Sequence, residues 1–438
     1  MRQAVVVIHG IGEQRPMSTL RSFVAHVLPA SEDNRSRLFS KPDSMSQTFE
    51  LRRLTAELSR KRPATDFYEY YWAHHMEGTK LRHLWPWARA ILLRSPTNVP
   101  KQLRALWLLS WLLACAAIAL FLTGRIAPDA VDSKTSSAAL VLALLFAAVQ
   151  AVAINWLGDA ARYLSPLPGN IAVRHKIRSE GLALLKELHV SGRYDRIVLV
   201  GHSLGSVIGY DILTIYWSQL HDSHRKPDRA PQPCLSEVEK LGRELDEASS
   251  GADVATFQEA QRALWSEQRR LGVPWLVTDF VTLGSPLAHA ELLLATGPRD
   301  LRTRQEQSEL PMCPPIGQLS GRNSTVKRYH RVVKYSFKNQ PRSIRVLHHD
   351  ALFAATRWSN VYVPLRFGLL GDLVGGPLRP IFGSGVRDVA VNDGLLRFAP
   401  VLTHTRYWRG RAVPKKEGRV TALGSLCNAL DLEAAKWL

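Results

Sequence analysis

A serine between two glycines, placed where a strand turns into a helix, constrains this chain more than any other feature. Residues 196–200 (Arg-Ile-Val-Leu-Val) are a short, mostly apolar run rich in β-branched side chains, which predicts a buried parallel strand. The run leads into Gly201-His202-Ser203-Leu204-Gly205, and residues 206–213 continue as a predicted helix. A serine at so sharp a turn has a strained backbone, and the flanking positions must be glycine because a side chain there would clash. Its hydroxyl then stands above the free N–H groups of a helix N-terminus, which stabilise negative charge.

A second junction between a strand and a loop lies at the start of the sequence. Residues 4–8 (Ala-Val-Val-Val-Ile) predict another buried strand, which runs directly into His9-Gly10-Ile11-Gly12. A loop of small residues lets a backbone N–H turn toward a reacting group. The two glycines alone also fit a simple tight turn, but the serine motif downstream favours a shared site.

A reactive serine needs a base, and the base needs an acid that orients it. Residues 357–364 predict a strand, followed by a glycine-rich loop whose one acid is Asp372. Residues 386–391 predict a further strand, and His404 follows it. The order Ser, Asp, His and the placement after two successive strands assign Asp372 as the acid and His404 as the base.

Other acids and histidines compete for these two roles. Asp388 lies within a predicted strand, where it points to solvent or pairs with Arg387, and Asp393 fits a turn before Gly394. The remaining rivals are one acid and two histidines that are close together in the sequence: Asp350, His348 and His349.

These motifs resemble the lipase and esterase branch of the α/β-hydrolase superfamily, above all GPI inositol-deacylase-like and small bacterial lipase-like proteins. The resemblance covers residues 1–75 and 171–410, including Thr282-Leu283-Gly284-Ser285-Pro286 after a further predicted strand. It implies a mostly parallel sheet with helices on both faces, and cleavage of an ester, amide or thioester through an acyl-enzyme, without a cofactor. It also implies an oxyanion hole formed by the backbone N–H groups of Leu204 and of Gly10 or Ile11.

Two long uncharged segments interrupt the resemblance. Residues 105–124 contain no charged side chain, and residues 137–158 have only Gln150 and Asn155 as clearly polar residues. About twenty apolar residues cross a bilayer as a helix. The sequence therefore predicts a transmembrane hairpin inserted between the two halves of the hydrolase domain.

The charges around these segments predict how the protein would lie in a membrane. Residues 78–104 contain six Lys and Arg residues and no acid, and such segments stay on the cytoplasmic side. We therefore expect an integral membrane protein with two spans and a cytoplasmic catalytic domain, in the inner membrane if the source is bacterial. The net charge of +19 comes with no nucleic-acid motif, and attraction to anionic lipid headgroups explains it.

The predicted organisation has four parts. They are the N-terminal part of the hydrolase domain (1–75), the membrane insertion (76–170), the rest of the hydrolase domain (171–410, with a helical insertion at 235–272) and a C-terminal tail or helix (411–438). Residues 221–234 and 296–343, which contain Pro, Arg and Ser, predict loops. The four cysteines are far apart and lack metal-type spacing, so we expect reduced thiols and no metal site.

The predicted function is that of a membrane-embedded serine hydrolase, lipase- or esterase-like, whose substrate is a membrane lipid or a lipid-like ester. Two alternatives share the same fold. One is a lipid acyltransferase, and the other is a weakly active or inactive membrane scaffold or regulatory protein. Fold resemblance alone does not identify the substrate.

Overall fold

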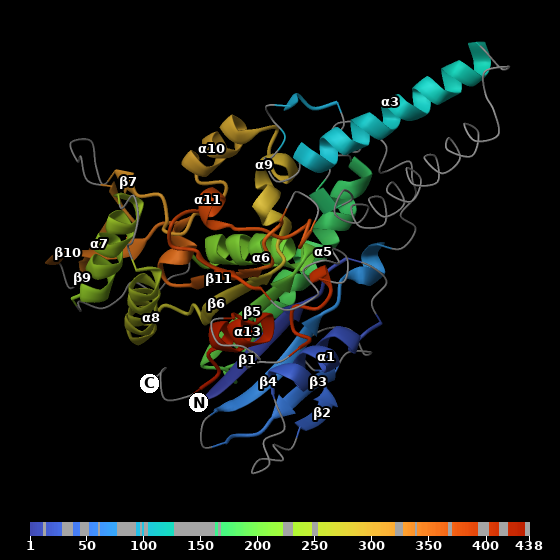
Figure 1. Cartoon of the computed structure of the whole chain (residues 1–438). Coiled ribbons are helices and arrows are strands. Elements are labelled where there is room, and N and C mark those ends of the chain that lie inside the picture. Colours follow the sequence, from blue (N-terminus) through green and yellow to red (C-terminus); the bar gives the residue numbers. More distant parts are fainter. Residues whose placement is uncertain are drawn as a thin grey trace.

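The computed structural model describes the chain apart from residues 12–14, 29–37, 44–51, 60–61, 77–92, 97–98, 100–103, 127–162, 165–167, 222–230, 248–252, 320–326, 338–339, 367–369, 393–402, 411–418 and 434–438. An eight-stranded sheet in the order β12-β11-β6-β5-β1-β4-β3-β2 crosses its centre (Figure 1). Six neighbouring strands are parallel: β1 (Arg2–Ile8), β4 (Ala64–Tyr70), β5 (Arg196–His202), β6 (Val277–Leu283), β11 (Arg357–Tyr362) and β12 (Arg387–Ala390). The antiparallel strands β2 (Leu38–Pro42) and β3 (Arg52–Ala56) extend the edge beside β4. The predicted α/β class with a mostly parallel sheet is confirmed.

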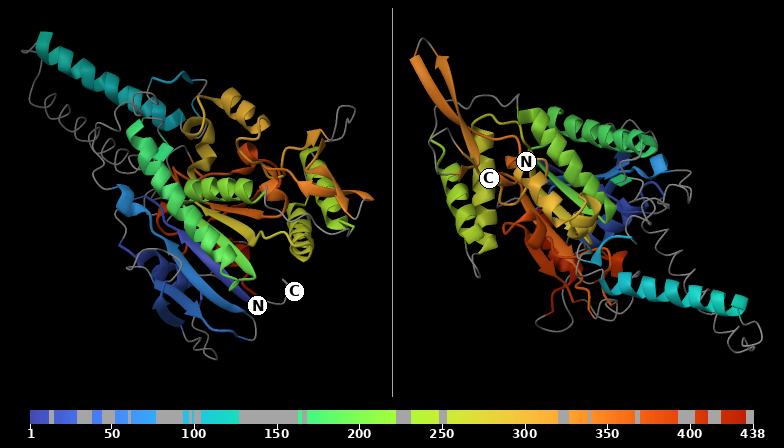
Figure 2. Two further views of the ribbon diagram at one scale, coloured as in Figure 1. Left: turned by 180° about the vertical axis from the view of Figure 1, so that it is seen from behind. Right: turned by 90° about the horizontal axis from the view of Figure 1, so that it is seen from above.

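Both faces of the sheet are covered, which explains why its central strands are apolar at nearly every position. In β1, Val6 and Ile8 contribute to one core and Val5 and Val7 to the other, because successive side chains point to opposite faces. Helices α5 (Pro168–Val190) and α6 (Leu204–His221) cover the first face, and α1 (Ser18–Val27) and α13 (Ala422–Leu430) cover the second (Figures 1 and 2).

The remaining described elements surround this sheet. They are η1 (Ala73–Met76), α3 (Arg104–Ile126), α7 (Pro233–Glu247), α8 (Val254–Arg270), η5 (Pro286–His289), α9 (Ala290–Leu293), α10 (Pro298–Glu306), β7 (Gln318–Leu319), β8 (Lys327–Arg328), β9 (His330–Phe337), β10 (Gln340–Leu347), η6 (Ala351–Ala354) and α11 (Arg379–Phe382). Helices α7 and α8 pack against each other and bury Leu235, Val238, Phe257 and Leu264 in the core that contains α6.

The expectation that residues 296–343 form loops is wrong in part. Helix α10 and the whole of β9 lie within this range, and β9 pairs with β10 as an antiparallel hairpin. Arg, Ser and Pro are common in loops, but an antiparallel pair supplies its own backbone hydrogen bonds and tolerates polar side chains on an open face.

The predicted transmembrane hairpin is also wrong. Among the residues that the structure describes, no helix is both long and apolar enough to cross a membrane, which takes about twenty consecutive apolar residues in one helix. The first predicted span, 105–124, falls on α3, which projects away from the sheet (Figure 1). The second, 137–158, lies outside the described residues. The localisation as an integral membrane protein with two spans rested on this hairpin and is corrected with it.

A buried ion-pair network ties the strands together at the end where they begin. The Arg196 side chain is fully buried and donates to Asp279 Oδ2 at 2.7 Å and to the carbonyl of Leu430 at 2.9 Å. Arg357 donates to the other oxygen of Asp279 at 2.7 Å. These contacts hold the C-terminal end of α13 at the N-terminal ends of the strands, whereas Ser203 lies at their C-terminal ends.

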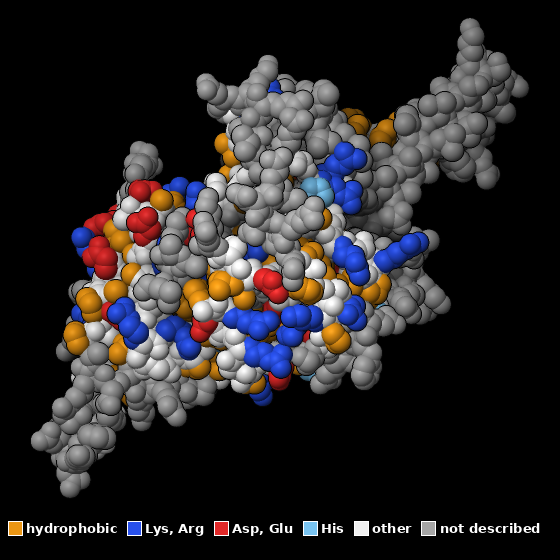
Figure 3. Space-filling model, turned by 90° about the horizontal axis from the view of Figure 1, so that it is seen from below, with side chains coloured by type: hydrophobic (Ala, Val, Ile, Leu, Met, Phe, Trp, Pro, Cys, Tyr) orange, Lys and Arg blue, Asp and Glu red, His pale blue; other side chains and the backbone are white. Residues whose placement is uncertain are grey.

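One face of the protein is rich in basic residues. Seen from below in Figure 3, Lys and Arg side chains gather near the middle of this face.

Candidate active site

The backbone of Ser203 has the strained conformation that the motif predicts. Ser203 lies between the last residue of β5 and the first residue of α6, and its φ of 52° falls in the left-handed region. Residues other than glycine adopt this region rarely, at a cost of about 1–3 kcal/mol. Two backbone hydrogen bonds hold the turn: Ser203 N donates to Leu283 O at 3.0 Å, and Ser206 N donates to Ser203 O at 2.9 Å.

The two glycines of the motif are required by close backbone contacts. A Cβ atom on Gly201 would lie 2.4 Å from Cα of Ser206, and one on Gly205 would lie 2.3 Å from the carbonyl oxygen of Ile8. Both distances are far below van der Waals contact. The turn can therefore bring α6 this close to β1 only if these positions lack a side chain.

The predicted oxyanion loop lies directly against Ser203. A Cβ atom on Gly10 would lie 2.8 Å from Cβ of Ser203 and 3.0 Å from Nδ1 of His202. Leu204 is fully buried and begins α6, while Ile11 is partly buried beside the same core. The three residues assigned to the oxyanion hole thus come from the two chain segments that meet at Ser203.

Asp372 and His404, thirty-two residues apart, form a buried hydrogen-bonded pair. His404 Nδ1 lies 3.0 Å from each carboxylate oxygen of Asp372, and both residues are at most 3% exposed. Asp372 lies in the loop after β11, and His404 follows β12. Because all parallel strands end at one edge of the sheet, this edge carries the serine, the acid and the histidine.

The carboxylate of Asp372 has further donors that keep it ionised. Tyr407 Oη donates to Oδ2 at 2.6 Å, and Val374 N donates to Oδ1 at 2.9 Å. Burial by itself would raise the pKa of Asp372, but the adjacent His404 and the hydrogen bonds from His404 and Tyr407 lower this pKa to about 2. A carboxylate that stays charged fixes the His404 ring with its Nδ1 protonated.

His202 connects this pair to the serine. Burial lowers the pKa of His202 to about 3, so its ring is neutral, and Nε2–H donates to the backbone carbonyl of His404 at 2.7 Å. The His202 and His404 ring centroids are 5.1 Å apart. Since His202 directly precedes Ser203 in the chain, the loop that carries His404 is anchored next to the serine.

The rivals His348, His349 and Asp350 lie elsewhere in the structure. His348 and Asp350 form another buried histidine–acid pair. The His348 carbonyl accepts a hydrogen bond from Trp217 Nε1 at 3.3 Å. Trp217 follows Ser203 by fourteen residues, which is about 20 Å along α6. His349 is exposed beside them.

Of the two later acids, the structure describes Asp388, which has other partners than His404. Asp388 caps the backbone N–H groups of Leu378 and Arg379 at 3.0 and 2.8 Å, where the sequence suggested solvent or Arg387. Asp393 lies outside the described residues.

Sequence reasoning missed two contributors to this site. Tyr407, which binds the acid, follows His404 by three residues, but no local pattern distinguishes it from other tyrosines. Ser206 donates to Ser203 O and lies 2.6 Å from the Ser285 hydroxyl, so the Gly284-Ser285 segment after β6 supports the serine turn. The Thr282–Pro286 motif indicated that segment, but not its contact.

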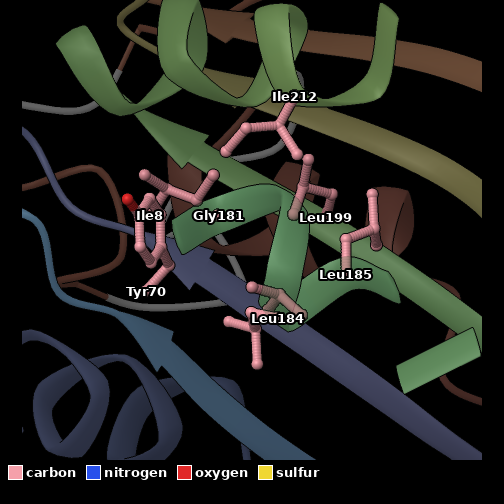
Figure 4. Close-up of a pocket in the computed structure, with 8 residues that line it drawn as sticks. Ile8, Tyr70, Gly181, Leu184, Leu185, Leu199 and Ile212 are labelled. Atoms are coloured by element: carbon pink, nitrogen blue, oxygen red, sulfur yellow. The ribbon is translucent and has the colours of Figure 1, made fainter. Parts of the chain in front are cut away.

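A small cavity in the protein lies away from these residues. It is lined by apolar side chains of β1, α5, β5 and α6, including Ile8, Leu184, Leu199 and Ile212, and by Tyr70 (Figure 4). It includes none of Ser203, Asp372 and His404. The hydroxyl of Tyr70, the one polar side-chain group in its lining, donates to the Ile177 carbonyl, so the cavity offers little to orient a substrate.

Comparisons of the chain with protein families, with curated proteins and with solved structures found no match.

The buried histidines predict that acid destabilises the fold. Burial lowers the pKa of His9 and His189 to about 4 and that of His202 to about 3, so below pH 6.5 the unfolded chain binds protons that the folded chain does not. Glu69 opposes this effect, because burial raises its pKa to about 7 and its contribution is lost as the pH rises from 4.5 to 7. Burial lowers the pKa of His289 as well, so four histidines against this one carboxyl leave a net uptake of protons on unfolding.

We therefore expect the free energy of unfolding to fall by at least about 2 kcal/mol as the pH is lowered from 6 to 5. Urea unfolding followed by circular dichroism at pH 7, 6 and 5 measures this slope. A free energy of unfolding that is constant or larger at pH 5 would contradict the assignment of neutral buried histidines.

Proposed function

We propose that this protein is a serine hydrolase that cleaves an ester through an acyl-enzyme on Ser203. The observation that carries the proposal is the strained Ser203 at the carboxyl edge of the sheet, with the buried Asp372–His404 pair anchored to its neighbour His202. A serine whose backbone is in the left-handed region costs free energy, and such strain is typical of functional sites. A charged carboxylate behind a histidine is the arrangement that makes a neutral hydroxyl nucleophilic.

The proposed reaction has two steps. His404 Nε2 accepts the proton of the Ser203 hydroxyl while Oγ attacks the carbonyl carbon of the ester. The N–H groups of Leu204 and of Gly10 or Ile11 stabilise the oxyanion, and protonated His404 then gives its proton to the leaving alcohol. In the second step His404 deprotonates a water molecule, whose oxygen attacks the acyl carbon; the bond from this carbon to Oγ breaks, protonated His404 returns the proton to Oγ, and the acid product leaves. Asp372 stays ionised throughout and stabilises the charged imidazole.

The proposal includes the fold: within the α/β class, we propose the α/β-hydrolase fold. Its support is the order of the chain along one sheet edge: the oxyanion loop follows β1, the serine follows β5, the acid follows β11 and the histidine follows β12. The motif resemblance to lipases and esterases further suggests a carboxylic ester with a lipid-like acyl group as the substrate class.

A fluorophosphonate probe tests the proposal directly, because it phosphonylates a serine only where a base and an oxyanion hole activate it. The full chain is incubated with the probe, digested, and the modified peptide is identified by mass spectrometry. We expect a single adduct on the peptide that carries Ser203. No adduct, or an adduct on the neighbouring Ser285 instead, would refute the assignment.

A further inference from the structure

Two histidines and a glutamate from distant parts of the chain converge beside the end of β4. His74 and His75 lie on η1, directly after that strand, and Glu180 lies on α5. Glu180 Oε2 is 2.7 Å from Nε2 of His75 and 3.7 Å from Nε2 of His74. One ligand atom from each of the three residues can be chosen so that all lie within 4.8 Å of one another. Among the described residues this is the one such group of metal-ligating side chains.

The geometry points to a metal ion more than to an ion pair. A hydrogen bond from His75 to Glu180 explains why one imidazole lies at the carboxylate oxygen. The second imidazole, of His74, faces the same oxygen, and the two ring centroids are 3.8 Å apart. The side chains of His74 and Glu180 are 35% and 45% exposed, and ion pairs so exposed contribute little stability. A cation between the three groups binds both rings and the carboxylate at once.

The donor set selects the kind of ion. Two imidazoles with one carboxylate suit zinc and other late transition metals, whereas calcium and magnesium take oxygen ligands. Zinc bonds of about 2.1 Å in tetrahedral geometry separate neighbouring ligand atoms by about 3.4 Å. The distances from Glu180 to the two histidines, 2.7 and 3.7 Å, lie on either side of this value, and all three ligand atoms lie within 4.8 Å of one another, so side-chain shifts on the order of 1 Å bring them to zinc distances.

We propose that His74, His75 and Glu180 bind one divalent zinc-like ion, with water in the remaining position. This site is separate from the serine site and does not depend on the proposed hydrolase activity. It clamps η1 to α5, next to the hydrogen bond from Tyr70 Oη at the end of β4 to the Ile177 carbonyl of α5. Tyr71 stacks on His74 and contacts His9, so the ion is linked through Tyr71 to the loop that contains Gly10.

Metal competition tests the site without any activity assay. The full chain, free of any histidine tag, is titrated with zinc chloride against a chromophoric chelator, and separately with cobalt(II), whose visible absorption reports a four- or five-coordinate site. Glu180→Gln keeps the size of an exposed side chain and removes the charge, and His75→Ala removes a ring. Glu187→Gln and His175→Ala change exposed residues of the same helix and serve as controls.

We expect the wild-type chain and both controls to hold one equivalent of zinc. Glu180→Gln and His75→Ala should bind it at least about tenfold more weakly and lose the cobalt absorption. Circular dichroism confirms that each variant is folded. The proposal is overturned if the wild-type chain does not compete for zinc, or if folded Glu180→Gln binds zinc and cobalt as the wild type does.

Discussion

Replacing Ser203 with Ala is expected to lower the rate of ester hydrolysis by about 10⁴-fold or more and to abolish labelling by fluorophosphonate. The reason is that the hydroxyl is the atom to which the acyl group is transferred, and no other group in the described site replaces it. Only an oxygen atom is removed, and the backbone bonds that hold the turn remain. Thermal unfolding should therefore change little. Initial rates on a chromogenic ester and in-gel probe fluorescence measure the loss.

A matched serine gives the control for this variant. Ser179 is exposed on α5, outside the site, and Ser179→Ala should keep full activity and full labelling. If Ser203→Ala hydrolyses the ester at the wild-type rate, Ser203 is not the nucleophile and the proposed function fails. Loss of activity together with loss of the folded circular dichroism spectrum would show that Ser203 acts in folding, which also contradicts the proposal.

The second large effect is expected from the acid and base. His404→Ala should lower the rate nearly as far as Ser203→Ala, because nucleophile and base act as a unit. Asp372→Asn should lower it by about 10⁴-fold, since an amide can hold the imidazole in the wrong tautomer and no longer stabilises its charge. Both rates are measured as kcat/KM on the same chromogenic ester.

Another buried histidine–acid pair supplies a close control for this experiment. Asp350 binds His348 as Asp372 binds His404, but it lies at the far end of α6 from Ser203. Asp350→Asn should therefore leave kcat/KM within a few-fold of the wild type even if it lowers stability. If Asp350→Asn abolishes turnover of the folded protein while Asp372→Asn does not, the acid has been assigned wrongly.

The sequence predicts best those parts of the site that are encoded by a few consecutive residues. The strands at residues 4–8 and 196–200 were predicted correctly because strands buried on both faces are apolar at every position. The glycines at 201 and 205 were predicted to relieve clashes, and the structure shows which atoms would clash: Ser206 Cα and the Ile8 carbonyl. Each of these features is encoded within a few consecutive residues.

The membrane prediction was wrong because it relied on the composition of a segment alone. It treated an uncharged run, residues 105–124, as sufficient for a spanning helix, and none of the described helices meets the requirement of length and apolarity. Likewise, the hairpin of β9 and β10 was hidden by polar and basic residues, because an open antiparallel pair needs no continuous apolar signal. Composition is a poor guide wherever a segment is not buried on both faces.

By itself, the sequence determined the chemical identity of the candidate site: a serine at a turn that only glycines permit, and an acid and a histidine in the order that follows two later strands. Order and placement in the sequence already favoured Asp372 and His404; the tertiary structure showed that these two form a buried pair at the sheet edge that carries Ser203, whereas His348 and Asp350 lie at the far end of α6. It also placed Tyr407 on the acid, and brought Glu180 to two histidines more than a hundred residues earlier. The physical reason is that strand ends converge at one sheet edge only after the sheet has formed, so distances between distant residues are properties of the packed fold.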